Sequence, residues 1–182
     1  VEKGFGVKRF NLMYNDFIIV GPKNNSANII ISDDPIEAFE KIFNTSSIFI
    51  SRGDDSGTHF KEMSIWTKAE LKPRQFSGSW YREVGSGMGA TLNLASGMGG
   101  YTITDRASWV NFSNKNDLKI LTEKNKLLFN QYGITMVNPL KCPNTNSNDA
   151  KKFINWLISP KGQDKIKNFK VKNQQLFFPN AN

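Results

Sequence analysis

Apolar positions along this chain form short continuous runs in some segments and follow helical spacing in others. Residues 16–21 make an apolar run closed by a Gly-Pro pair, which predicts a buried strand that enters a turn. Residues 35–44 follow Asp34, with a proline at the first position and a glutamate at the third. Because their apolar side chains also share one face, they are expected to form an N-capped amphipathic helix.

The C-terminal third carries a second strong helical pattern. Apolar residues keep the 3-4-7-8 spacing over 147–158, and Ser159-Pro160 ends this helix and starts another that carries Ile166 and Phe169. Further strands are predicted at 100–104, 118–121 and 132–137.

A strand, a polar glycine turn and a helix follow one another twice in the middle of the chain. A strand at 46–52 leads through a turn at 53–57 into a helix at 57–69. A second turn at 84–89 leads into a helix at 88–96. This alternation favours an α/β fold with a mixed or parallel sheet.

Composition narrows the possible classes of protein. With 182 residues, 38% of them hydrophobic, the chain is long enough for one substantial domain or two small lobes. No apolar run approaches the roughly 18 residues that span a bilayer, so no membrane span is expected. The chain opens without an initiator Met or a signal peptide, which favours a mature or trimmed product. Its one cysteine, Cys142, leaves the redox compartment open.

A net charge of +8 is compatible with nucleic-acid, membrane-surface or small-anion binding. The basic residues scatter through 112–126 and 151–172 among Asn, Asp and apolar positions instead of clustering. A solvated basic surface therefore explains them better than a nucleic-acid partner does.

The segment 51–58 carries the most informative chemistry. It lies between a strand end and a helix start, where open α/β sheets bind ligands and unpaired backbone N–H groups attract anions. Arg52 adds a permanent positive charge in a planar fork that suits two oxygens of one oxyanion. Ser51, Ser56 and Thr58 add hydroxyl donors. The alternative is an Arg52 that simply pairs with Asp54 or Asp55 at the surface.

The turn at 85–91 would supply a second set of backbone N–H groups, with glycines that permit close backbone approach. An ordinary glycine turn with a Ser or Thr cap explains the same pattern, so this turn alone decides little.

Other interpretations of the 51–58 segment are weaker. Arg52-Gly53-Asp54 spells an integrin-recognition tripeptide, which three residues match easily by chance. Asp54 and Asp55 lack further ligands nearby in the sequence, so a cation site is not expected. Ser56 and His59 lie three apart with no third group to orient the histidine, which is expected at the surface or in a cap. We therefore expect neither an enzyme nor a cofactor.

Five motifs, found in order between residues 4 and 181, resemble the tungstate-binding substrate proteins of ABC transporters. The motifs span 14–22, 51–59, 87–93, 101–106 and 175–181. This resemblance implies an α/β type II periplasmic-binding-protein fold, in which two lobes joined by two crossing segments hold an anion in a cleft. It assigns 1–21 to the end of lobe one and the first crossing, 22–125 to lobe two, and 126–182 to the second crossing and the rest of lobe one.

The chain departs from the family pattern at its N-terminus. The family carries an upstream Thr/Ser-rich loop that contacts the anion, and no such loop precedes Val1. Lobe one is therefore expected to be incomplete, with a sheet edge and apolar surface exposed.

The resemblance also implies the ligand residues and the partners. Arg52 and Thr58 are the leading anion ligands, with Ser51, Ser56 and Gly57 as loop neighbours; Ala90 and Thr91 follow from the second helix start. The expected role is capture of tungstate or molybdate for the permease of an ABC importer, in the periplasm or at the outer face of the membrane. The alternative is an oxyanion-sensing domain of a transcription regulator.

Overall fold

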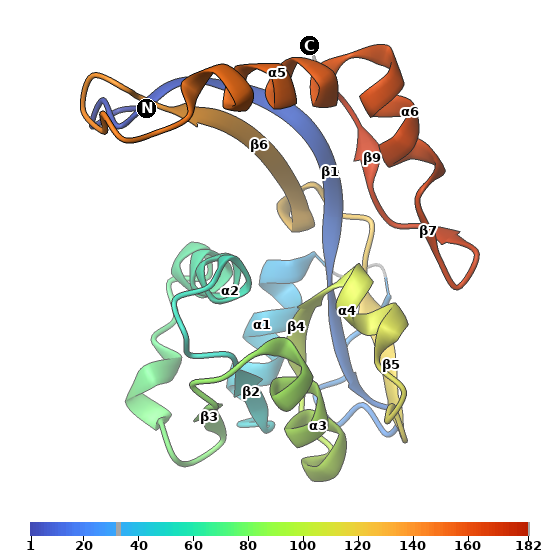
Figure 1. The fold of residues 1–182 in the computed structure, drawn as a ribbon. Coiled ribbons are helices and arrows are strands. Elements are labelled where there is room, and N and C mark those ends of the chain that lie inside the picture. The colour runs from blue at the N-terminus through green and yellow to red at the C-terminus, as the bar shows by residue number, and fades with distance from the viewer. Residues whose placement is uncertain (32–33, 182) are drawn as a thin grey trace. The chain divides into compact units, whose positions relative to one another are not determined.

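The computed structural model describes residues 1–31 and 34–181, which form two compact units (Figure 1). Unit 2 is the continuous segment 16–129, and unit 1 combines 1–15 with 130–182. The resemblance placed the two boundaries at 21/22 and 125/126, whereas the units divide at 15/16 and 129/130. Each boundary lies within or beside a long strand, β1 (Gly6–Pro22) and β6 (Phe129–Val137).

The strands of unit 2 form a mixed arrangement. The second half of β1 pairs antiparallel with β4 (Thr102–Asp105) and with β5 (Leu118–Thr122). By contrast, β2 (Phe49–Ser51) pairs in parallel with β3 (Tyr81–Glu83), and Phe49 forms a further parallel bridge to Tyr101. Parallel and antiparallel pairs thus coexist, as the alternation of strands and helices predicted.

Four α-helices and two 3₁₀ turns complete the described part of unit 2. They are α1 (Pro35–Asn44), α2 (Gly57–Lys68), α3 (Met88–Met98), α4 (Arg106–Asn111), and the turns Pro73–Phe76 and Lys126–Leu128. The predicted bounds of α1 are confirmed, because Asp34 accepts from the Ile36 N–H while Glu37 accepts from the Asp34 N–H. This reciprocal capping fixes the first turn locally.

Alternate residues of β1 face two separate hydrophobic clusters. Phe17 and Ile19 belong to a cluster with Phe39 and Trp66. Ile18 and Val20 belong to a second cluster, which includes residues of helix α3. Successive strand side chains point to opposite faces, so a strand covered on both faces is apolar throughout. This double burial explains the uninterrupted apolar run that predicted the strand.

Unit 1 is built on the first half of β1. This half pairs antiparallel with β9 (Phe178–Pro179), and β6 also pairs with β1. Helices α5 (Ser147–Ile158) and α6 (Pro160–Asn168) follow one another through Ser159, whose hydroxyl accepts from the Gly162 N–H. A short hairpin of β7 (Lys170–Val171) and β8 (Gln174–Gln175) comes next.

Several elements differ from the sequence predictions. β1 begins ten residues before the predicted strand, because Lys8 and Arg9 interrupt the apolar pattern of its half-exposed first part. The six residues of α4 are too few for a helical period to be recognised. Phe169 lies just beyond α6 and not within it.

In unit 1, Phe153 and Trp156 of α5 stack on each other while 57% and 43% exposed. Within the described ranges, no helix combines the length and the hydrophobicity needed to cross a bilayer.

Candidate anion-binding site

The two strand-turn-helix segments predicted from the sequence lie beside each other in unit 2. Strand β2 leads into α2, the parallel strand β3 leads into α3, and the carboxyl ends of parallel strands share one edge of a sheet. The backbone of Val84 donates to the Ser51 carbonyl at 3.0 Å, and that of Gly85 donates to the Arg52 carbonyl at 2.9 Å. Both helix starts therefore open from the same edge.

Gly53 makes this close approach possible. Its φ of +59° lies in the left-handed region, and a Cβ added there would meet the Glu83 Cβ at 2.9 Å. Any larger residue would force the 51–58 loop away from β3. The backbone geometry of the loop is thus fixed by one residue without a side chain.

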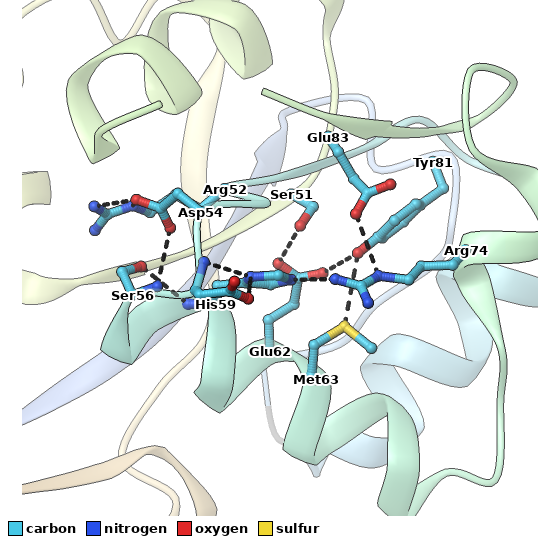
Figure 2. Close-up of polar contacts among 11 residues, drawn as sticks. Ser51, Arg52, Asp54, Ser56, His59, Glu62, Met63, Arg74, Tyr81 and Glu83 are labelled. Carbon is cyan, nitrogen blue, oxygen red and sulfur yellow. Dashed lines mark hydrogen bonds and ion pairs between the residues drawn. The ribbon is translucent and has the colours of Figure 1, made fainter. Parts of the chain in front are cut away.

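Arg52 reaches out from the end of β2 and pairs with Asp54 (Figure 2). Its Nε and Nη2 lie 2.9 and 2.7 Å from the same oxygen, Asp54 Oδ2, and its side chain is 21% exposed. A guanidinium has five N–H donors, so this pairing leaves three of them without an acceptor among the described residues. The Arg52–Asp54 pair given as the alternative is therefore present, but it leaves N–H donors of Arg52 available for a ligand.

Asp54 holds the loop as well as the arginine. Its Oδ1 accepts from the Ser56 N–H at 3.2 Å. Partial desolvation raises the pKa of Asp54, but the hydrogen bonds from Ser56 and Arg52 and the charge of Arg52 outweigh it and hold the pKa below its ordinary value. Asp54 is therefore ionised at neutral pH and orients Arg52.

The start of α2 presents backbone donors. Ser56 is the N-cap, and its hydroxyl accepts from the His59 N–H at 3.3 Å. The N–H groups of Gly57 and Thr58 have no acceptor within the described parts of the chain. Gly57 is exposed and a Cβ added there would meet nothing within 4 Å, whereas Thr58 is only 6% exposed. The backbone of this turn is thus better placed for an anion than the hydroxyl groups are.

The start of α3 has no side-chain cap. Its N-cap is Gly87, and no side chain accepts from the first turn. Ala90 is exposed, while Thr91 is fully buried and its hydroxyl donates to the Gly87 carbonyl at 3.2 Å. Any contribution of Ala90 and Thr91 to anion binding would therefore come from the backbone of this turn.

Ser51 faces inward and not towards the loop. It is fully buried, and its Oγ donates to Glu62 Oε2 at 2.7 Å. Glu62 also accepts from Tyr81 Oη at 2.7 Å (Figure 2). Trp66 Nε1 donates to the same oxygen, Oε1, at 3.2 Å. Burial raises the pKa of Glu62 to about 7, although all three hydrogen bonds lower it.

Sequence reasoning missed Glu62. The available signal was a carboxylate on the apolar face of α2, since residues 58, 59, 62, 65 and 66 are the buried positions of this helix. A charge at such a position is rare unless it has polar partners.

His59 was predicted to lie at the surface or in a cap, and the prediction of a surface position is wrong. His59 is 2% exposed, its Nδ1 accepts from the Asp55 N–H at 3.0 Å, and its Nε2 lies 3.2 Å from Arg74. Its hydrogen bond from the Asp55 N–H supports a loop residue that has a φ of +55°. Ser56 contacts only the backbone N–H of His59, so the pair has no nucleophile–base hydrogen bond.

Over 1–31 and 34–181, no group of three or more His, Cys, Asp and Glu side chains is arranged to hold a cation. The donors left over at this edge, among the described residues, are three guanidinium N–H groups of Arg52 and first-turn N–H groups of two helices.

Comparisons with known proteins identify the family of this chain. Residues 1–161 match a PBP superfamily domain. The chain belongs to the periplasmic-binding-protein (PBP) superfamily. Within that superfamily it is 42% identical, over 185 residues, to the tungstate-binding protein TupA of Peptoclostridium acidaminophilum, covering all of this chain and 64% of that protein.

Two solved structures are similar to this chain in fold as well as in sequence. The PBP domain superposes on the tungstate-binding protein TupA from Desulfovibrio alaskensis G20 with a TM-score of 0.86 and 42% identity, covering 100% of this chain and 74% of that one. The tungstate ABC transporter structure from Geobacter sulfurreducens gives a TM-score of 0.79 and 43% identity, covering 92% and 70%. The chain spans 54% to 68% of the length of three curated relatives.

Proposed function

We propose that this PBP domain captures a tetrahedral oxyanion, tungstate or molybdate, for an ABC importer. Its work is then recognition without turnover, outside the cytoplasmic membrane, with the permease as the partner that receives the anion. The names of its relatives support a binding protein over an enzyme, because they describe tungstate-binding proteins and an ABC transporter.

The observation that carries the proposal is the partly committed guanidinium of Arg52. Asp54 takes two of its five N–H donors through a single oxygen, and the start of α2 adds the free N–H groups of Gly57 and Thr58. Charge-assisted hydrogen bonds from such a fork are stronger than neutral ones and suit two oxygens of one anion. The macrodipole of α2 adds about half a positive charge at the same place.

Selectivity depends on whether Asp54 or Asp55 faces the anion, and the exposed Asp55 lies with its Oδ1 3.5 Å from His59 Nδ1. Tungstate and molybdate carry no proton at neutral pH, so a site made of donors suits them. Phosphate keeps a proton that needs an acceptor, and the nearby Asp54 already uses both oxygens for Arg52 and Ser56. The domain should therefore disfavour phosphate, while size separates tungstate from the smaller sulfate.

Calorimetric titration of the protein with tungstate, molybdate, sulfate and phosphate, at one pH and ionic strength, tests the proposal. We expect heat from tungstate and molybdate and little from phosphate. Tight phosphate binding without tungstate heat would overturn the proposal, and so would the absence of heat from all four anions.

The alternative role, an oxyanion-sensing domain of a transcription regulator, uses the same fold. None of the relatives named above is described as a regulator. Transport therefore remains the better supported proposal.

A further inference from the structure

Unit 1 carries the whole net charge of the chain. It holds 11 of the 24 basic residues but only 3 of the 16 acidic ones, whereas unit 2 holds 13 of each. Unit 2 is therefore neutral, and unit 1 has a formal charge of +8. The spacing of the lysines alone does not reveal this, because it depends on where the acidic residues lie. A charge asymmetry between two parts of a chain indicates a partner of opposite charge.

The charge of unit 1 is concentrated in residues 161–172, which we call the basic segment. It covers most of α6, Phe169, and the first strand and turn of the β7–β8 hairpin (Figure 1). Five lysines and a single acid, Asp164, lie within it. All five lysines are exposed: Lys161, Lys165, Lys167, Lys170 and Lys172.

The basic segment has a defined backbone shape. Gly162 packs against α5 so closely that a Cβ added there would meet the Trp156 carbonyl oxygen. The hairpin turn has φ values of +48° at Lys172 and +63° at Asn173, and a tight two-residue turn of this kind fixes the pairing of its strands. The lysines therefore project from folded elements and not from a loose tail.

The stability of α6 does not explain its lysines. The helix macrodipole favours Lys165 and Lys167 in the last turn but disfavours Lys161 in the first. Lys161 and Lys165 also lie one turn apart on the same face, where like charges repel. None of the three has a carboxylate partner among the described residues, whereas Lys152 of α5 pairs with Asp149 at 3.4 Å. A negatively charged surface outside the protein would relieve this repulsion.

An exposed aromatic ring lies among these lysines. Phe169 is 53% exposed, and its ring centroid lies 6.2 Å from that of Phe177, which supports it on one side. Apolar rings beside lysines are typical of segments that lie on a bilayer, where the ring enters the head-group region and the ammonium groups stay near the phosphates. The segment has no Arg, the residue whose rigid fork recognises bases and phosphates in nucleic acids. Its composition therefore favours a lipid surface over a nucleic acid.

We propose that the basic segment binds the surface of a membrane that contains anionic phospholipids. The lysines contact the lipid phosphates, and Phe169 adds apolar contact below the head groups. The inference goes beyond the proposed capture of an oxyanion and does not depend on it. Every residue that carries it lies in unit 1, whereas Arg52 and α2 lie in unit 2.

Sedimentation of the protein with sucrose-loaded vesicles tests the proposal. Vesicles of phosphatidylcholine alone are compared with vesicles in which about one third of the lipid is phosphatidylglycerol, at about 0.1 M and about 0.5 M salt. We expect binding to the anionic vesicles and not to the neutral ones. Binding should weaken at the higher salt, because the screening length falls from about 10 Å to about 4 Å.

Two triple variants locate the contact. Replacing Lys161, Lys165 and Lys170 together by Gln should weaken binding to the anionic vesicles roughly 100-fold, because each lysine near such a surface contributes about fivefold. The control variant lowers the net charge equally, but at three exposed lysines of unit 2, and should bind within about twofold of wild type. It combines Lys68→Gln, Lys72→Gln and Lys119→Gln. Phe169→Ala should weaken binding about fivefold at both salt concentrations, since apolar contact is not screened.

Several results would overturn the proposal. Equal binding to neutral and anionic vesicles would do so, as would no sedimentation with either. An equal loss in the two triple variants would show that binding follows the net charge and not the basic segment. A short DNA duplex, added at the same phosphate concentration as the anionic lipid, is the final competitor. If it displaces the protein from the vesicles, the segment binds nucleic acid instead.

Discussion

Arg52 and Arg106 are matched in exposure but differ in what is left for a ligand. Their side chains are 21% and 22% exposed, each follows the end of a strand, and each pairs with an aspartate. Arg52 meets one oxygen of Asp54. Arg106 meets both oxygens of Asp16, at 2.7 and 2.5 Å, and also Glu123 at 2.8 Å.

The difference lies in charge balance. One carboxylate neutralises Arg52 and leaves its outer N–H groups unpaired, whereas two carboxylates surround Arg106. The hydrogen bonds from Arg106 to Asp16, followed by those to Glu123, raise its pKa despite desolvation. We infer that Arg106 stabilises unit 2, since Asp16 lies near its beginning and Glu123 near its end. An arginine near an acid is thus a binding candidate only if donors remain.

Replacing Arg52 is the most direct test of this difference between the two arginines. Arg52→Ala should weaken tungstate binding 100-fold or more, because each hydrogen bond to a charged group contributes roughly 1.5–3 kcal/mol and two are lost. Calorimetry measures the effect. Arg9→Ala, an exposed arginine of unit 1, is the control and should bind as wild type does. Unchanged affinity in Arg52→Ala would remove the central ligand of the proposed site.

Glu62, unlike the two arginines, is an ionisable group whose hydrogen-bond partners are all uncharged. Its folded pKa is about 7, against an ordinary value of 4.5, so the native state binds more protons between these values. Stability is therefore highest below about pH 4.5 for this group and falls as the pH rises through 7, by at most about 3 kcal/mol. Urea unfolding of wild type and Glu62→Gln across this range checks it. Parallel pH profiles would contradict the assignment.

Removing Arg106 tests the other side of the comparison. Arg106→Ala leaves Asp16 and Glu123 facing each other and should lower the free energy of unfolding by about 2 kcal/mol, between the values for exposed and buried pairs. Tungstate affinity of the folded fraction should stay within about twofold of wild type. Denaturant unfolding and calorimetry together provide the measurement. A large loss of affinity without a loss of stability would reverse the roles of the two arginines.

The smallest effect is expected at Asp54. Asp54→Asn weakens the contact that orients Arg52 and should lower the free energy of unfolding by about 1 kcal/mol at neutral pH. Because the folded pKa of Asp54 is lowered, its stabilisation is lost as the pH falls through that value. The difference between variant and wild type should therefore vanish in acid. Thermal unfolding at neutral and acidic pH measures both halves, and a difference that persists in acid would refute this account.

Sequence reasoning succeeded where the determinants are local. The bounds of α1 follow from Asp34 and Glu37, which cap it within four residues. The turn before α2 was recognised because a strand, glycines and a Ser cap follow one another directly. The same holds for α5, whose apolar spacing predicts its bounds as the structure has them.

Sequence reasoning failed where partners come from distant segments. The partner of Glu62 on β3 lies 19 residues away, and Arg106 lies 90 residues from Asp16. Neither distance can be inferred from local spacing. Ser51 illustrates the consequence, since its hydroxyl seemed available to a ligand until Glu62 was found beneath it. The first half of β1 was missed because its charged residues face solvent on a half-covered strand.

Gly53 and Gly57, four positions apart, are constrained by different requirements. A side chain at 53 would meet the body of β3, so every substitution there costs folding. An added Cβ at 57 meets nothing within 4 Å, so a substitution there should leave the fold intact and affect only the anion that we propose at the start of α2. In a mutational scan, substitutions at position 53 would be depleted by a selection for soluble protein. Substitutions at position 57 would be depleted only by a selection for growth on scarce oxyanion.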